Sequence, residues 1–358
     1  MFGLKNQENQ LFHQQWTGQL TEYITAINWS IQGDLAASSA AGEVMLWQSQ
    51  SESSVLLLKP YDTQDQSINC LGFSADGQFL AAGGQDGKIR IWQIQPELDL
   101  IHTLDFGSQW IEHLCWHTNK QELAFSLGRY VQVWDAVAGE IIITLPFASS
   151  SVLGLTWQPL GERLAMAGNG GIKVWDRKNW DEDPLILEMP GACTQVAWSF
   201  DGEYIAGSCL DQTVWLWRWG NNEPWRMTGF GGKVRNLTWS KPKSGVAPLL
   251  AVSSYENIIV WKKAEKDEQG WFSRALSLHN DKICDLQFHP QSLLLASVAE
   301  DGMLLLWQKA KQLTQRLTGA SSGFSVVAWH PSGNQLAAGG QASEVLVWTK
   351  SQRGQGFG

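Results

Sequence analysis

One motif recurs eight times along this chain of 358 residues and limits its fold more than any other feature. A short apolar run ends at a tryptophan, as in GKIRIW or GMLLLW, and the tryptophans follow one another at intervals of 41 to 46 residues. They are Trp47, Trp92, Trp134, Trp175, Trp217, Trp261, Trp307 and Trp348, and we number the repeats one to eight by them. A period of this length indicates a unit that stacks on copies of itself.

Each repeat contains four short apolar segments. The first has the form apolar-x-x-apolar-x-aromatic, as in INCLGF; the second is rich in small residues, as in FLAAGG; the third ends at the tryptophan. A fourth segment, such as EIIITL, follows every closing tryptophan except the last. Alternation with a period of two, and turns of Gly, Asp, Asn and Pro between the segments, predict strands and an all-β fold.

The period, the four strands and the pairs Trp134-Asp135 and Trp175-Asp176 resemble the WD-repeat β-propeller family. The resemblance covers residues 10–349. It implies a closed β-propeller, and the eight repeats predict eight four-stranded blades, with seven, the commoner number in the family, as the alternative. A four-stranded blade cannot cover both of its faces alone, so blades stack around an axis.

The two ends of the chain are expected to meet. Only seven fourth strands follow a closing tryptophan, so the eighth must come from elsewhere. Residues 10–20, QLFHQQWTGQL, are predicted to pair with the strand around Val345 to Trp348 and complete the last blade. The expected organisation is an N-terminal tail (1–9), one propeller domain (10–349) and a flexible C-terminal tail (350–358).

Composition excludes several classes of partner. Lys and Arg number 26 against 35 Asp and Glu, a net charge of −9, so no broad positive field is available to bind nucleic acid. The first residues contain no signal-peptide core, and no segment has the roughly 18 consecutive apolar residues of a spanning helix. We expect a cytoplasmic protein with no integral membrane association, whose five scattered cysteines are reduced.

Repeat seven contains a possible catalytic triad, His279, Ser297 and Asp301. The resemblance implies another role. In the WD-repeat pattern these positions and the closing Trp307 form a hydrogen-bonded structural tetrad. Catalysis would need an exposed serine, an oxyanion hole and a cleft, so we predict a structural role and no enzymatic activity.

No metal or cofactor is expected. The histidines His117, His289 and His330 follow the first-strand aromatic residue in three different repeats. Equivalent positions in separate repeats lie too far apart to share one ion, because ligand bonds are only about 2 Å long. The glycine-rich segments fall in strands or turns and not in a phosphate-binding loop before a helix.

Partner binding is predicted on the face that gathers the loops before each first strand and between the second and third strands. Candidate residues near the first strands are Tyr23, Trp110, Glu112, Lys233, Arg235 and Lys282. Tyr, Trp and Arg dominate binding hot spots. In repeat five Trp215, Trp219 and Trp225 form a second candidate surface, for which packing on one another is the favoured interpretation.

Three functions are compatible with these features. The favoured one is a noncatalytic WD-repeat scaffold that mediates protein-protein interactions through its loop-rich face and binds one or more proteins. The alternative is a small-molecule binder or enzyme that uses the central channel. A third, weaker one is association with membrane surfaces or nucleic acid through Lys233, Arg235 and Lys282, three charges on an acidic chain.

Overall fold

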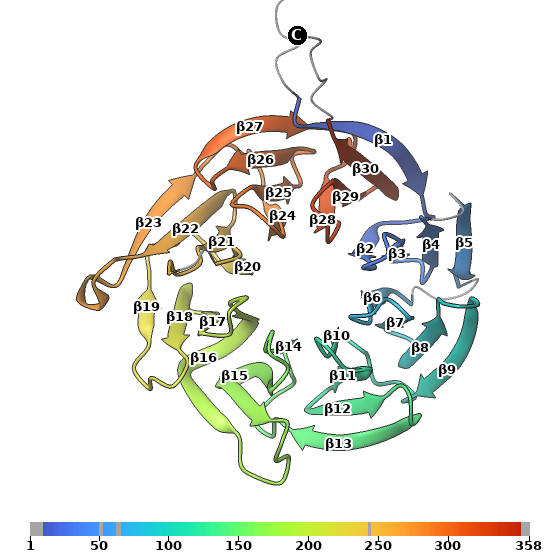
Figure 1. Ribbon diagram of the computed structural model, residues 1–358, viewed down its shortest axis with the longest axis horizontal. Coiled ribbons are helices and arrows are strands. Elements are labelled where there is room, and N and C mark those ends of the chain that lie inside the picture. The colour runs from blue at the N-terminus through green and yellow to red at the C-terminus, as the bar shows by residue number, and fades with distance from the viewer. Residues whose placement is uncertain (1–9, 50–52, 62–65, 243–244, 352–358) are drawn as a thin grey trace, which may run out of the picture.

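The computed structural model describes residues 10–49, 53–61, 66–242 and 245–351. It shows β-sheets arranged as a ring around a central axis, with the first strand of each repeat innermost (Figure 1). The single helical element of these residues is a 3₁₀ turn, η1 (Asp267–Gln269). In the described residues no helix has the length and apolarity needed to cross a membrane. The predicted tail 1–9 and residues 352–358 of the C-terminal tail lie outside this range.

Six of the sheets have four antiparallel strands each, in the order first to fourth strand from the axis outwards. Repeats one to three form β2 (Ile24–Trp29), β3 (Leu35–Ser39), β4 (Val44–Gln48) and β5 (Ser53–Leu58); β6 (Ile68–Phe73), β7 (Phe79–Gly84), β8 (Lys88–Gln93) and β9 (Asp99–Asp105); and β10 (Leu114–Trp116), β11 (Glu122–Leu127), β12 (Tyr130–Asp135) and β13 (Glu140–Pro146). Repeats six and seven form β20 (Val234–Trp239), β21 (Leu250–Ser254), β22 (Asn257–Lys263) and β23 (Trp271–Leu276); and β24 (Ile283–Phe288), β25 (Leu295–Ala299), β26 (Leu304–Gln308) and β27 (Gln312–Leu317). The sixth sheet joins β28 (Phe324–Trp329), β29 (Gln335–Gly340) and β30 (Glu344–Lys350) to β1 (Phe12–Gln19).

The prediction of eight four-stranded blades is wrong, because the strands of the described residues form seven sheets. The seventh sheet has six strands and contains repeats four and five together. Its strands are β14 (Gly154–Trp157), β15 (Arg163–Asp176), β16 (Leu185–Trp198), β17 (Tyr204–Cys209), β18 (Thr213–Arg218) and β19 (Trp225–Met227). The eight sequence repeats are therefore distributed over seven sheets, the number that the sequence left as its alternative.

The two repeats merge because β16 is continuous. Its first half pairs with β15, as in Leu187 opposite Ile172, and its second half pairs with β17. Other repeats have a loop at this point, and Pro190 and Gly191 predict one here as well. Met189 and Cys193 instead pack over Gly207, where a Cβ atom would come within 2.8 Å of the Cys193 sulfur. This packing holds the segment extended.

The N-terminal strand closes the ring. β1 pairs antiparallel with β30 from Phe12 opposite Lys350 to Gln19 opposite Glu344, as predicted for residues 10–20. The indole nitrogen of Trp29 also donates to the carbonyl oxygen of Ala328 at 3.1 Å, which joins repeat one to repeat eight near the axis. Strand β30 ends at Lys350, one residue beyond the predicted domain boundary.

The hydrophobic core lies between neighbouring sheets. One cluster combines residues of β25 and β26 with residues of β28 to β30, and equivalent clusters follow around the ring. The second strands are almost completely buried, and several are rich in Ala and Gly, as in β7. A Cβ atom at Gly83 would approach Ile111 to 2.7 Å, so small residues here allow adjacent sheets to come close.

Candidate functional site

The four residues of the predicted tetrad form a continuous hydrogen-bonded chain in repeat seven. The His279 Nδ1 atom lies 3.0 Å from the Asp301 carboxylate, and its Nε2 atom lies 2.8 Å from the Ser297 hydroxyl. The Trp307 indole nitrogen donates to the same hydroxyl at 2.9 Å. Asp301 also accepts backbone N–H groups of Asn280 and Met303, each at 3.0 Å. The chain thus joins two turns and two strands of one sheet.

The direction of these bonds follows from the chemistry of each group. Burial lowers the pKa of His279, although the adjacent Asp301 opposes this shift, so the imidazole is neutral at pH 7. Because the carboxylate of Asp301 can only accept, Nδ1 carries the proton and Nε2 accepts from Ser297. The Ser297 oxygen then accepts the indole N–H of Trp307. Every group of the chain is satisfied, and Ser297 is 0% exposed, out of reach of a substrate.

Other repeats use their turn aspartates differently. Asp86 of repeat two accepts the hydroxyl of Tyr61 at 2.6 Å and pairs with Arg90 at 2.7 Å. Burial and the bond to Asp86 raise the pKa of Tyr61 to about 12. Asp211 of repeat five accepts the N–H and hydroxyl groups of Thr213. Repeat two therefore secures its turn with Tyr61 and Arg90, which the sequence pattern did not indicate.

Trp110 and Glu112 line a hollow on the loop-rich face. The hollow has a volume of about 350 Å³ and lies between the loop before β10, the turn from β11 to β12 and the loop before β14. Trp110 is 54% exposed and Tyr130, the first residue of β12, is 51% exposed. Arg129 and Glu112 add one charge of each sign to its lining. Two exposed aromatic rings and a mixed pair of charges at a concave site suit a protein-binding hot spot.

Three other predicted residues belong to a second cluster, on repeats one, six and seven. Lys282 forms an ion pair with Glu300, which raises the pKa of Lys282, and the charge of Arg235 opposes this shift. Burial raises the pKa of Tyr23, which also interacts with Lys282 and Glu300. Glu300 was absent from the predicted set, although it precedes the turn aspartate Asp301. Because Lys282 is neutralised, the expected positive patch is reduced to Arg235 and the exposed Lys233.

A buried carboxyl group joins three repeats below this cluster. Asp285 in β24 accepts the backbone N–H of Val327 in β28 at 3.1 Å and that of Leu286 at 2.8 Å. The side-chain amide of Asn236 in β20 donates to it at 3.4 Å. Burial raises the pKa of Asp285 to about 6, while the backbone hydrogen bonds limit the rise.

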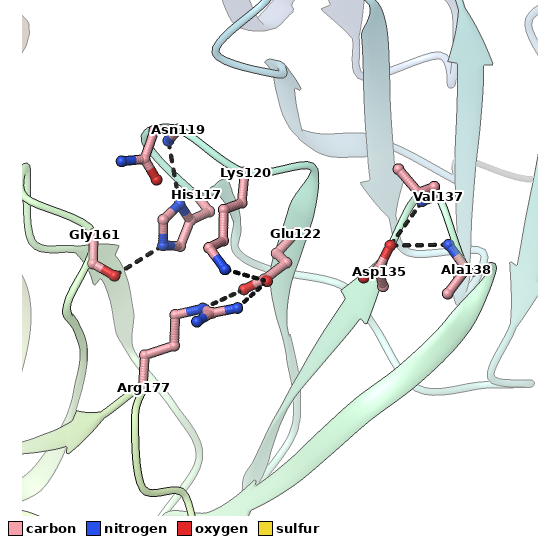
Figure 2. Close-up of polar contacts among 9 residues, drawn as sticks. All are labelled: His117, Asn119, Lys120, Glu122, Asp135, Val137, Ala138, Gly161 and Arg177. Carbon is pink, nitrogen blue, oxygen red and sulfur yellow. Dashed lines mark hydrogen bonds and ion pairs between the residues drawn. The ribbon is translucent and has the colours of Figure 1, made fainter.

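The opposite face carries contacts between repeats that the sequence reasoning missed. The His117 Nε2 atom lies 2.8 Å from the carbonyl oxygen of Gly161, and His289 makes the same contact with Gly333 at 3.1 Å (Figure 2 shows the first). Each glycine stands 44 residues after its histidine. A polar residue after the first-strand aromatic, one repeat length before a turn glycine, is the sequence signal for these contacts.

An ion pair also joins repeats three and four, beside the contact between His117 and Gly161. The guanidinium group of Arg177 donates two hydrogen bonds to the buried Glu122, one of them 2.7 Å long, and Lys120 lies 4.0 Å away (Figure 2). The bond to Glu122 raises the pKa of Arg177. These contacts explain His117 without a metal ion. In the described residues no group of three or more His, Cys, Asp or Glu side chains could hold one.

The extra tryptophans of repeat five pack within the protein and all three are half-buried. Trp215 stacks on Trp217 with ring centres 6.3 Å apart. Trp219 contacts Trp198 edge to face at 5.0 Å. Trp225 contacts Trp271 edge to face at 6.2 Å. Cations cover their other faces, with Arg226 over Trp215, Arg163 over Trp219 and Lys263 over Trp225.

Comparisons with known proteins agree with the repeat pattern. A family model described as WD domain, G-beta repeat matches residues 56–93, 139–176, 185–218, 270–308 and 311–349, together just over half of the chain. The chain is similar to the transcriptional corepressor LEUNIG_HOMOLOG of Arabidopsis thaliana, 24% identical over 287 residues, 78% of this chain and 35% of the relative. It is also similar to apoptotic protease-activating factor 1 of Rattus norvegicus, 27% identical over 128 residues, 32% of this chain and 10% of the relative. The chain thus spans about a third and about a tenth of these two relatives.

Proposed function

Because the chain belongs to the WD domain, G-beta repeat family, we propose that it is a noncatalytic scaffold that binds a partner protein on its loop-rich face. The observation that carries this proposal is the hollow between Trp110 and Tyr130, where two large rings are exposed on a rigid frame. Exposed aromatic residues at a concave site supply contact area with little loss of side-chain entropy.

The geometry of repeat seven supports the noncatalytic part of the proposal. Asp301, His279 and Ser297 have the order of a catalytic triad, yet the hydroxyl group is buried and already accepts the indole N–H of Trp307. A nucleophile needs a free approach for the substrate and donors for the oxyanion. We assign this set a structural role.

The Trp110 hollow and the Lys282 cluster call for separate tests, because they belong to repeats three and seven, on different parts of the ring (Figure 1). The double variant Trp110→Ala/Tyr130→Ala is expected to keep the fold and to lose the main partner. Loss of two hot-spot aromatics weakens binding by about 100-fold or more. Arg235→Ala is expected to change capture by less than about threefold, since it lies outside the hollow.

The measurement is affinity purification from native lysate with quantitative mass spectrometry. Phe272→Ala is the matched control, because Phe272 is an equally exposed aromatic on the outer strand β23. Partners retained by the wild type and Phe272→Ala but lost by the double variant support the hollow as the binding site. Retention of the same partners by the double variant contradicts it.

A further inference from the structure

A second cavity lies on the face opposite the Trp110 hollow, where first strands end. Its volume is about 260 Å³, and it lies between repeats six and seven. Five cationic side chains line it: Lys241, Lys262, Arg274, Lys309 and Lys311. Among the residues that the structure describes, no carboxylate side chain lines it. Such a concentration of positive charge is unexpected on a chain with a net charge of −9.

The five cations lack partners of their own. Over residues 10–49, 53–61, 66–242 and 245–351, none of them forms an ion pair or a side-chain hydrogen bond. The neighbouring Lys263, in contrast, pairs with Asp267. The Nε atom of Arg274 is buried without an acceptor, and burial lowers the pKa of this residue. A buried donor left unpaired costs about 1–3 kcal/mol.

Bringing these cations together costs free energy, in backbone conformation and in repulsion between charges. Lys309 and Ala310 form the turn between β26 and β27 with φ angles of 54° and 49°. Gly and Asn are the usual residues in this left-handed region, since a Cβ atom is disfavoured there. Like charges around one cavity also repel one another. A bound anion would relieve this repulsion.

Four apolar residues also line the cavity: Val246, Ala247, Leu249 and Leu293. The cavity therefore fits an anionic group carried on an apolar chain better than a free ion. A phosphomonoester has a charge of about −1.5 to −2 and three strong acceptor oxygens, so it can engage several Lys and Arg side chains at once. A single carboxylate offers less charge and fewer acceptors.

The surroundings favour a peptide over a membrane surface. A neighbouring hollow of about 740 Å³ shares Val246, Ala247 and Lys262 with the basic cavity. Four carboxylates line it: Asp201, Glu203, Glu265 and Asp267. Arg218 and Lys263 also line this hollow and pair with Glu203 and Asp267. In the described part of the chain Asp201 and Glu265 have no ion pair, and these two carboxylates disfavour an anionic bilayer surface. A peptide can place a phosphate in one hollow and basic residues over the other.

We propose that the cavity lined by Lys241, Lys262, Arg274, Lys309 and Lys311 binds a phosphorylated side chain of a partner protein, with an apolar neighbour of that side chain against the lining residues Val246 and Leu293. This site is separate from the proposed protein-binding hollow. Trp110→Ala/Tyr130→Ala is therefore expected to bind a phosphopeptide as the wild type does, so the two proposals can fail independently.

The test is isothermal titration of the full chain with the peptide Arg-Ala-Leu-phosphoSer-Leu-Ala and with its unphosphorylated form. We expect saturable binding of the phosphorylated peptide only. Lys309→Gln/Lys311→Gln is expected to weaken it at least about tenfold, because two charge-assisted contacts are lost. The matched control Lys233→Gln/Arg235→Gln removes two cations from the other face and is expected to change affinity less than about twofold.

Three results would overturn the proposal. The first is the absence of saturable binding of the phosphorylated peptide. The second is equal weakening by the cavity variant and the matched control, which would indicate a general effect of charge. The third is binding of phosphatidylcholine vesicles that contain phosphatidylinositol phosphate without binding of the peptide, which would indicate a membrane site. Because the lysines are exposed turn residues or strand ends, the cavity variant is expected to fold normally, with thermal unfolding as the check.

Discussion

Closure of the ring depends on one short strand, and Phe12 is its anchor. This side chain is 2% exposed and contacts Trp329 edge to face, with ring centres 5.4 Å apart. The Gln315 side chain of β27 holds the backbone of Phe12 from both sides, accepting its N–H at 2.9 Å and donating to its carbonyl oxygen at 2.6 Å. Phe12→Ala removes the ring and leaves these backbone bonds in place.

The expected loss of stability can be worked out from this environment. Replacing a buried phenylalanine by alanine typically costs about 3–5 kcal/mol, which includes the cavity left behind. The lost contact with Trp329 accounts for about 0.5–1.5 kcal/mol beyond the buried area. We therefore expect the free energy of unfolding to fall by about 3–5 kcal/mol. Deletion of residues 1–20 removes all of β1 and is expected to lower the melting temperature further.

Urea unfolding and amide hydrogen exchange measure this effect. The urea midpoint is expected to fall by about 1 M, because a chain of this size has a steep dependence on denaturant. Phe272→Ala is the control, since this ring is 60% exposed on β23 and its loss is expected to cost less than about 0.5 kcal/mol. Exchange in Phe12→Ala should accelerate first in β1 and β30, because the seam opens before the rest of the ring.

Two results would refute the closure argument. A loss below about 1 kcal/mol would mean that the anchor contributes little, contrary to its burial. Uniform acceleration of exchange in all seven sheets, with no preference for β1 and β30, would mean that the seam has no independent opening.

Two further predictions concern buried polar groups. Ser297→Ala leaves His279 and Trp307 without their shared partner and is expected to lower the free energy of unfolding by about 1–3 kcal/mol, measured by urea unfolding against the exposed control Ser273→Ala. Asp285 binds a proton more tightly in the folded state, so stability falls as pH rises from about 4 to 6 and then levels. The Asp285→Asn variant should lack this slope. Between pH 4 and pH 7 its free energy of unfolding should therefore rise by about 1–3 kcal/mol relative to that of the wild type. Parallel pH profiles of the two proteins would contradict the assignment.

The local pattern of the sequence was sufficient for the strands and for the seam. Alternation and turn residues depend on neighbours in the chain, and the count of fourth strands placed residues 10–20 beside β30. The continuity of β16 could not be predicted in this way. Pro190 and Gly191 indicate a break locally, whereas pairing with β15 and β17 and the packing of Met189 and Cys193 against Gly207 of the next repeat favour the extended segment.

The candidate sites were predictable residue by residue but not as groups. Trp110 and Lys233 are exposed near the first strands, as their positions in the repeat suggest. The sequence did not pair Trp110 with Tyr130, because Tyr130 begins the third strand of the repeat and comes close to Trp110 only when the sheet forms. It also missed the basic cavity, whose cations extend from Lys241 to Lys311 and come together only through the stacking of two repeats.

Repeat seven, which contains the complete tetrad, lies at a position in the ring that affects both proposed sites. Repeat seven lies next to the seam, and its Gln315 holds the closing strand. At every other junction a covalent linker connects consecutive repeats, whereas the last repeat is joined to the first without one, by β1 and by contacts near the axis such as the hydrogen bond from Trp29 to Ala328. A rigid repeat seven therefore supports the junction that lacks a linking segment. The same repeat forms one wall of the basic cavity, so loosening the seam is expected to weaken phosphopeptide binding before it affects the Trp110 hollow across the ring.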